Sequence, residues 1–353
     1  AIDLSKSRGR RLTTTLLGAI GVVLALIAAA AVASAKPDVD ALQRRPVAVS
    51  ASLVSYFLPT EPKRAVFGKL RFIGGLQLSA EQPFGGFSGL VIGVDGRRLL
   101  SVSDAGFWLS ATISYEAGIL SGITDAVIGP IVGKDGKVLG RDNDRDVEAA
   151  SLVSGSIGDG SVALAFERHD RLTEYSVNLQ GLGAPLRNLP LPDYVARLKA
   201  NRGLESLTVI ASGPRRGSRL AFSEGRLDKR GHIRGWLMRD RRIEEVFLRP
   251  IDGSDVTDLA TLPNGDVIVL ERRFRWSEGV KMRLRRVKAS ELVAGAVISG
   301  EVLFDADGTY NIDNMEGVAV SRDANGGTII TLISDDNFSF FQRTLLLQFA
   351  LID

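Results

Sequence analysis

The chain contains five copies of one unit, and this repetition constrains its fold more than any other feature. Each copy begins with an acidic or hydroxyl residue and an apolar run, then has a turn and a second apolar run that ends in an acidic residue. The copies start at Ser88, Glu148, Glu205, Asp258 and Glu316, so their spacings are 60, 57, 53 and 58 residues. Repeats of this length are typical of architectures in which each unit is one supersecondary element that packs against its neighbours.

The two apolar runs of each copy predict β-strands. They are short, rich in β-branched residues and bounded by Gly, Asp and Asn, as in residues 267–270. Dipeptides such as Asp95-Gly96 and Asn264-Gly265 lie between the paired runs, where a tight hairpin turn needs a positive φ. Two further runs follow the hairpin in the full-length copies, so each unit is expected to supply four strands.

Four strands in a repeat of this length indicate one blade of a β-propeller. The last copy has room for only three strands, whereas residues 66–78 form an additional strand before the first copy. We expect this strand to complete the last blade and close the ring, which leaves no open sheet edge. The predicted fold class is therefore all-β, a β-propeller over residues 66–353. Five blades are expected, or six if the preceding residues contain another sheet.

The first 35 residues have the layout of an export signal. Four basic residues within the first eleven precede a run without charge over residues 12–35, and this run ends in small residues. About 20 apolar residues are enough to span a bilayer. We expect residues 1–35 to be a retained signal-anchor (transmembrane) helix in the inner membrane, with the remainder in the periplasm. The alternative is secretion after signal cleavage. Residues 36–65 contain several Pro and are predicted to be a linker.

The charge of the remaining chain gives no indication of nucleic-acid binding. The whole chain has 44 Lys and Arg against 41 Asp and Glu, and residues 1–35 hold four of the former and one of the latter. The remainder is balanced, so no nucleic-acid partner is expected. The chain has no Cys, which excludes disulfides and thiol chemistry.

The acidic residues of the repeats are the candidate functional residues. In a propeller blade the first strand lines the channel and the second returns beside it, so the start of one and the end of the other lie at the same mouth. This strand arrangement places nine acidic residues at one mouth of the channel: Asp104, Glu148, Glu167, Glu205, Glu224, Asp258, Glu271, Glu316 and Asp335. Like charges at such density need cations or basic partners.

Two interpretations of the acidic mouth are open. Neighbouring Arg residues could neutralise the acids and join the blades, or the carboxylates could hold a hard cation such as Ca²⁺, which takes about six to eight oxygen ligands. The proposed metal ligands are Asp104, Glu148, Glu205, Asp258, Glu316 and Asp335. The residues proposed to bind an anionic substrate are Arg145, Arg168, Arg202 and Arg272. Zinc and a serine nucleophile are not expected, because the chain has two His and no Gly-x-Ser-x-Gly motif.

The motifs around these acids also carry a family resemblance. They include Gly85-Gly86-Phe87-Ser88-Gly89, Arg145-Asp146-Val147-Glu148, Phe166-Glu167-Arg168 and Asp313-Asn314-Met315-Glu316-Gly317. Over about residues 66–352 these motifs resemble the phytase-like bacterial family labelled "esterase-like activity of phytase". The resemblance implies an exported propeller with an acidic channel mouth. Propeller phytases use Ca²⁺ to bind phosphate and activate water, which implies Ca²⁺ as the cofactor and a phosphorylated or ester small molecule as the substrate.

Two functions of different classes follow from these features. The first is an exported, membrane-tethered propeller that serves as a periplasmic accessory or binding subunit of an integral membrane protein complex, held at the membrane by residues 12–35. The alternative is a Ca²⁺-dependent phosphoester or ester hydrolase that uses the acidic mouth. Activity on a panel of substrates, with and without calcium, distinguishes the two.

Overall fold

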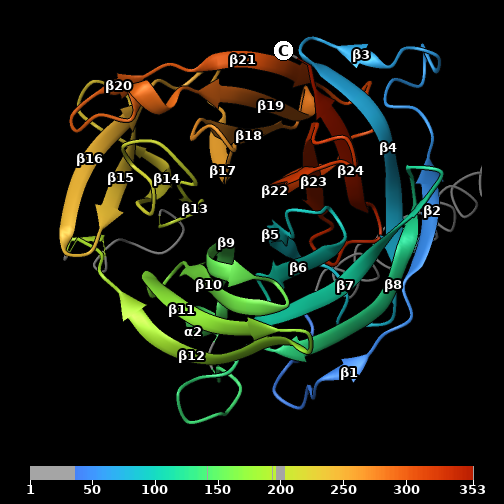
Figure 1. Cartoon of the computed structure of the whole chain (residues 1–353), viewed down its shortest axis with the longest axis horizontal. Helices are drawn as coiled ribbons and strands as arrows, with labels where there is room; N and C mark the ends of the chain where they lie inside the picture. The colour runs from blue at the N-terminus through green and yellow to red at the C-terminus, as the bar shows by residue number, and fades with distance from the viewer. Residues whose placement is uncertain (1–35, 141, 193, 196–202, 353) are drawn as a thin grey trace, which may run out of the picture.

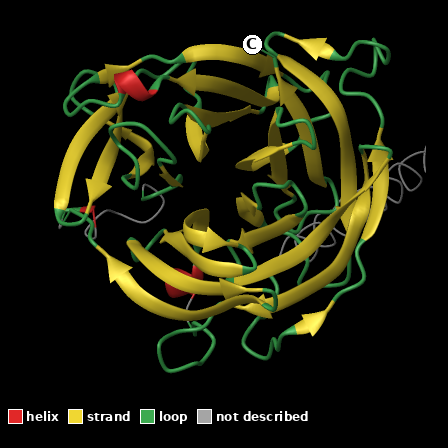
Figure 2. Ribbon diagram, in the orientation of Figure 1, coloured by secondary structure: helices red, strands yellow, loops and turns green. Residues whose placement is uncertain are grey.

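Five sheets of mainly antiparallel strands, arranged around a central axis, make up the part of the chain that the structure describes (Figure 1). The structure is a computed structural model, and it describes residues 36–140, 142–192, 194–195 and 203–352. The prediction of an all-β propeller with five blades is confirmed. Strands dominate the fold (Figure 2), and the helical turns include α2 (Asp142–Arg145) and the 3-10 turn η2 (Ala289–Glu291).

The predicted transmembrane helix lies outside the described residues. Among the helices within them, none has the length and apolar character that crossing a membrane requires.

Each blade has its first strand nearest the axis. These inner strands are β5 (Phe87–Ile92), β9 (Val147–Ser156), β13 (Thr208–Val209), β17 (Asp255–Thr261) and β22 (Asn314–Arg322). The second strands are β6 (Arg98–Ser103), β10 (Asp159–Phe166), β14 (Arg219–Leu227), β18 (Val267–Arg275) and β23 (Thr328–Asp335). The third strands are β7 (Phe107–Glu116), β11 (Arg171–Asn178), β15 (Ile233–Arg239), β19 (Gly279–Val287) and β24 (Thr344–Leu351). The fourth strands are β8 (Ile119–Pro130), β12 (Gly181–Leu189), β16 (Arg242–Leu248), β21 (Glu301–Ala306) and, in the last blade, β4 (Leu70–Ser79).

An N-terminal strand closes the ring, as predicted. β4 pairs antiparallel with β24 and becomes the fourth strand of blade 5. The single strand expected over residues 66–78 is instead a small hairpin, in which β3 (Val66–Phe67) folds back on β4. Gly68 makes this turn possible, because its φ is +57° and a Cβ there would lie 2.2 Å from the carbonyl oxygen of Leu303.

Residues 36–65, predicted as a linker, contribute to the propeller. β1 (Arg45–Pro46) pairs with β8, and β2 (Ser50–Val54) pairs with β4. Phe57 is buried in an aromatic cluster, with its ring centroid 4.9 Å from that of Phe349. A further short strand, β20 (Val297–Ile298), pairs in parallel with β16. These segments cover outer sheet edges whose backbone groups would otherwise be open to other chains.

Candidate functional site

One end of the central channel opens into a cavity of about 900 Å³ that is rich in acidic side chains. The nine acidic residues on its wall are Asp104, Asp146, Glu148, Glu167, Glu205, Glu224, Asp313, Glu316 and Asp335. The described basic residues on the wall are Lys36, Arg168 and Arg272. Acids from different blades therefore converge at one mouth, as predicted. Five of the six proposed metal ligands lie on the cavity wall: Asp104 from blade 1, Glu148 from blade 2, Glu205 from blade 3, and Glu316 and Asp335 from blade 5.

A β-bulge in the inner hairpin directs an acid into this cavity. In blade 2, Val147 pairs with Phe166 and Ala149 with Ala165, so Glu148 has no residue opposite it. The same one-residue shift occurs at Glu316 in blade 5, between Met315 and Gly317. In blade 3 the pairing shifts between Leu204 and Thr208, next to Glu205. Bulges of this kind re-aim a side chain and are frequent beside functional sites.

Asp258 does not lie on the cavity wall, in contrast to the prediction. The bulge residue of blade 4 is Thr257, because Val256 pairs with Glu271 and Asp258 pairs with Leu270. Asp258 is fully buried and accepts a hydrogen bond of 2.9 Å from the Val318 N–H of blade 5. A shift of one residue along a strand moves a side chain to the other face, so Asp258 joins two blades instead of facing the channel.

The second strand of blade 4 shows the same shift of one residue. On the second strand, the residue one position after the partner of the residue that precedes the bulge is acidic in the other blades: Asp104, Glu167, Glu224 and Asp335. Blade 4 has Arg272 at this position, and its Nε lies 2.9 Å from Glu316 Oε1. Glu271, which was predicted at the mouth, is buried within the blade in an ion pair of 2.5 Å with Arg285. Blade 4 thus supplies a positive charge to an otherwise acidic mouth.

Two of the four arginines predicted to bind an anionic substrate line the cavity. Arg272 pairs with Glu316, and Arg168 forms an ion pair with Asp146. Arg145 forms an ion pair of 2.7 Å with Asp40 and is not part of the cavity wall. Arg202 lies outside the described residues.

Lys36 and Asp146 belong to the site and were not among the predicted residues. The Nζ of Lys36 lies 2.8 Å from Asp104 and 3.2 Å from Asp146. Asp146 lies two residues before the bulge acid Glu148 in the same motif, and this position in the sequence could have identified it. Lys36 is 68 and 110 residues away from these partners in the chain, and no local pattern indicates such a contact.

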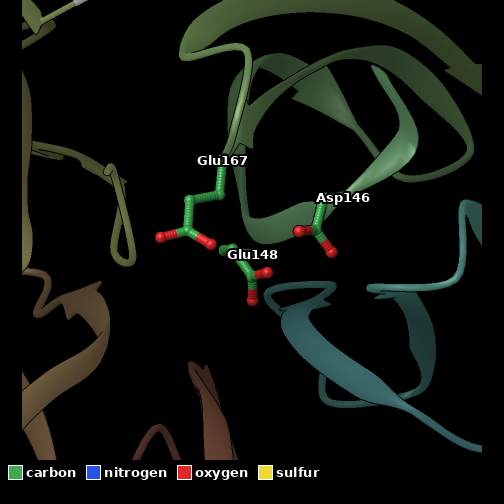
Figure 3. Close-up of side chains that lie close together, drawn as sticks. All are labelled: Asp146, Glu148 and Glu167. Carbon is green, nitrogen blue, oxygen red and sulfur yellow. The ribbon is translucent and has the colours of Figure 1, made fainter. Parts of the chain in front are cut away.

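Two groups of three carboxylates are close enough to share a cation. Asp146, Glu148 and Glu167 form the first triad, and Glu167, Glu205 and Glu224 form the second. In each triad one oxygen from every carboxylate lies within 4.8 Å of the others. Figure 3 shows the three side chains of the first triad directed into one space. Glu167 belongs to both triads, so two adjacent cations would share this carboxylate.

Burial and mutual repulsion change the protonation of the mouth. Desolvation, with additional repulsion from neighbouring carboxylates, raises the pKa of Glu148, Glu205 and Asp335 well above the usual range. Burial also raises the pKa of Glu316 to about 7, although Arg272 acts in the opposite direction. Cations that bind at these carboxylates would therefore compete with protons.

The chemistry of the wall fits a hard cation. Carboxylate oxygens of this density are the ligands that Ca²⁺ prefers. Asp104 Oδ1 is buried and has no hydrogen-bond partner among the described residues, which is costly unless a cation or water satisfies it. Full neutralisation by basic side chains is not achieved within the described part of the cavity, where three basic residues face nine acidic ones.

The fold and this site define a five-bladed propeller with an acidic channel mouth. The family model "Phytase-like: Esterase-like activity of phytase" matches residues 82–338, more than half of the chain, and the chain belongs to this family. A solved structure to which the chain is similar is the β-propeller domain of Cps50 (Swd1) from Myceliophteria thermophila. The identity is 11%, the TM-score is 0.36, and the match covers 85% of this chain and 98% of that one. No curated protein matches the sequence.

Proposed function

We propose that the chain is a metal-dependent hydrolase that holds two cations, with Ca²⁺ the best fit, in its acidic mouth and cleaves phosphate or carboxylate esters there. The observation that carries this proposal is the pair of carboxylate triads joined by Glu167. A purely structural ring of acids would need basic partners or bound protons in similar number, because an uncompensated buried charge is strongly destabilising. The described cavity wall has an excess of six acidic over basic side chains, which favours bound cations.

The residues of the mouth would have different roles in such a reaction. The two triads would hold the cations, which when bound would neutralise the ester group and lower the pKa of a bound water. Arg272 places a guanidinium beside the triads for a negatively charged substrate group. Glu316 pairs with Arg272, and its pKa of about 7 suits a general base. Hydrolysis of a phosphate ester joins a water oxygen to phosphorus and breaks the bond to the ester oxygen. One proton passes from the water, through Glu316, to the leaving oxygen.

Turnover of a panel of phosphate and carboxylate esters, in calcium and in EDTA, tests this function. We expect hydrolysis in calcium and a loss of at least about a hundredfold in EDTA and in Glu205→Gln, since each removes a cation or one of its ligands. Glu301→Gln is a suitable control, because Glu301 is an exposed partner of Lys69 on the outer strand β21. Its activity should match that of the wild type. Absence of turnover on the whole panel, despite bound calcium, would contradict a hydrolase.

A non-catalytic role as an accessory or binding subunit of a membrane complex is the second candidate. It is favoured by Lys36, whose ammonium lies between Asp104 and Asp146 as an internal counterion. Burial disfavours the charged form of Lys36, but the two carboxylates outweigh this effect and raise its pKa. Calcium binding without turnover in the same assay would support this role.

We also propose that the propeller is exported and held at the inner membrane by residues 12–35. The uncharged run and its basic flank support this proposal. Mass spectrometry of the protein purified from membranes measures where the native chain starts. We expect a chain that retains residues 12–35, whereas a native chain that starts at Ser34 or Lys36 would show that the segment is a removed signal.

A further inference from the structure

Every strongly exposed Phe and Trp side chain in the described chain lies in one of two segments beside the mouth. Phe274 lies near the end of β18 and Trp276 in the turn to β19, and they are 48% and 95% exposed. Phe340 and Phe341 lie between β23 and β24 and are 87% and 78% exposed. Exposed aromatic surface is unfavourable in water, so its concentration at one place indicates a binding surface.

Three of these four side chains line the same cavity as the carboxylates. Phe274, Trp276 and Phe341 are on its wall, and we call them the aromatic wall; Phe340 is not on the cavity wall. The rings of Phe274 and Trp276 are in edge-to-face contact, with centroids 5.4 Å apart. This contact orders the two rings relative to each other and makes a continuous apolar surface.

The cavity therefore has two chemically different sides. The carboxylate triads come from blades 2 and 3, whereas the aromatic wall comes from blades 4 and 5, and blade 5 also contributes the acids Asp313, Glu316 and Asp335. Arg272 precedes Phe274 by two residues in β18 and pairs with Glu316. A ligand that fills the cavity would meet cation-binding oxygens on one side, a guanidinium beside them, and flat apolar rings on the other side.

We propose that the mouth recognises an amphiphilic phosphate ester. Its phosphate lies at the triads and Arg272, and an aromatic or other flat apolar group lies against the aromatic wall. The inference rests on the proposed function, since the phosphate is held through the cations. A flat apolar group gains from ring contact and from removal of its surface from water. A ligand charged on every side would leave the aromatic wall open to solvent.

Calorimetric binding of non-hydrolysable phosphonates to the full chain in calcium tests this inference. We expect phenylphosphonate to bind at least about tenfold more tightly than methylphosphonate, because only the phenyl group offers a flat apolar surface to the aromatic wall. The double variant Trp276→Ser, Phe341→Ser should lose this preference and keep its affinity for methylphosphonate. Phe340→Ser is the matched control, since Phe340 is exposed in the same loop but lies off the cavity wall, and it should keep the preference.

The outcomes separate this inference from the proposed function. If neither phosphonate binds in calcium, phosphate binding at the mouth fails, and this inference fails together with the phosphate-ester form of the proposed function. If the two phosphonates bind equally well, or the double variant keeps the preference, only the inference of an amphiphilic ligand is overturned. Binding of phenyltrimethylammonium to the calcium-free protein, without binding of phenylphosphonate in calcium, would also overturn it, because the aromatic wall would then serve an organic cation.

Tryptophan fluorescence gives a second readout. Trp108 and Trp236 are buried, so quenching by acrylamide reports on Trp276. We expect phenylphosphonate in calcium to protect Trp276 from acrylamide and methylphosphonate to leave the quenching unchanged. Unchanged quenching at saturating phenylphosphonate would contradict the proposal that the phenyl group lies against Trp276.

Discussion

Calcium is expected to raise the melting temperature of the EDTA-treated protein by several degrees at pH 8 and by much less at pH 5. In the metal-free fold the carboxyl of Glu316 has a pKa of about 7, which burial raises from an ordinary value of 4.5. A raised pKa stabilises the fold below pH 4.5, and this stabilisation is lost as the pH rises through about 7. For Glu316 alone, the free energy of unfolding falls by on the order of 3 kcal/mol between pH values below 4.5 and above 7. At pH 8 cations bound in the neighbouring triads would offset the repulsion between the ionised Glu316 and acids such as Glu224, so calcium has its largest effect there.

Thermal melts in EDTA and in excess calcium, each at pH 5 and pH 8, measure this effect. Glu271→Gln is the matched control, because burial also raises the pKa of Glu271 to about 7 but its partner is Arg285, away from the mouth. Loss of this buried partner should destabilise the fold by on the order of 3–5 kcal/mol, equally with and without calcium. A wild-type protein whose melting temperature at pH 8 does not respond to calcium would argue against a cation site at the mouth.

Glu167→Gln is expected to weaken calcium binding at both cation positions, because Glu167 belongs to both triads. The amide keeps the volume of the side chain and an oxygen that can accept the 3.2 Å hydrogen bond from the Gly203 N–H. The variant removes one negative charge from each triad, so calcium affinity should fall by more than the roughly 10–100-fold that loss of an outer partner costs.

Calorimetry on Glu167→Gln and Glu224→Gln distinguishes a shared ligand from a general loss of negative charge. Glu224 belongs only to the second triad, so its variant should lose one calcium per chain and keep the other. The Glu167 variant should lose both at the same calcium concentration. Equal effects of the two substitutions would show that Glu167 is not shared between two sites.

The architecture was predictable because its signals are periodic. The repeat spacing defined the blades, and the strand before the first copy had the right place in the sequence to complete the last blade, as the pairing of β4 with β24 confirms. The contribution of residues 36–65 was not predictable, because β1 and β2 are short and their pairing partners are distant in the sequence. Phe57 becomes buried only through contacts made by the folded ring.

The candidate site was predictable in blades where the acid coincides with the bulge. Glu148, Glu205 and Glu316 occupy that position, and the repeat spacing identified each of them. Blade 4 differs because Asp258 comes one residue after the bulge residue Thr257. Its second acid, Glu271, comes one residue before the mouth position of Arg272. Residue type alone does not reveal a shift of one residue, yet the shift decides which side chain faces the channel.

The proposed two-cation site that shares Glu167 is tested most directly by anomalous X-ray scattering from calcium-loaded crystals of the full chain. We expect two peaks in the anomalous difference map, one within each triad, with Glu167 a ligand to both. A mouth without anomalous density at saturating calcium, in which Lys36, Arg168 and Arg272 alone balance the acids, would contradict this site.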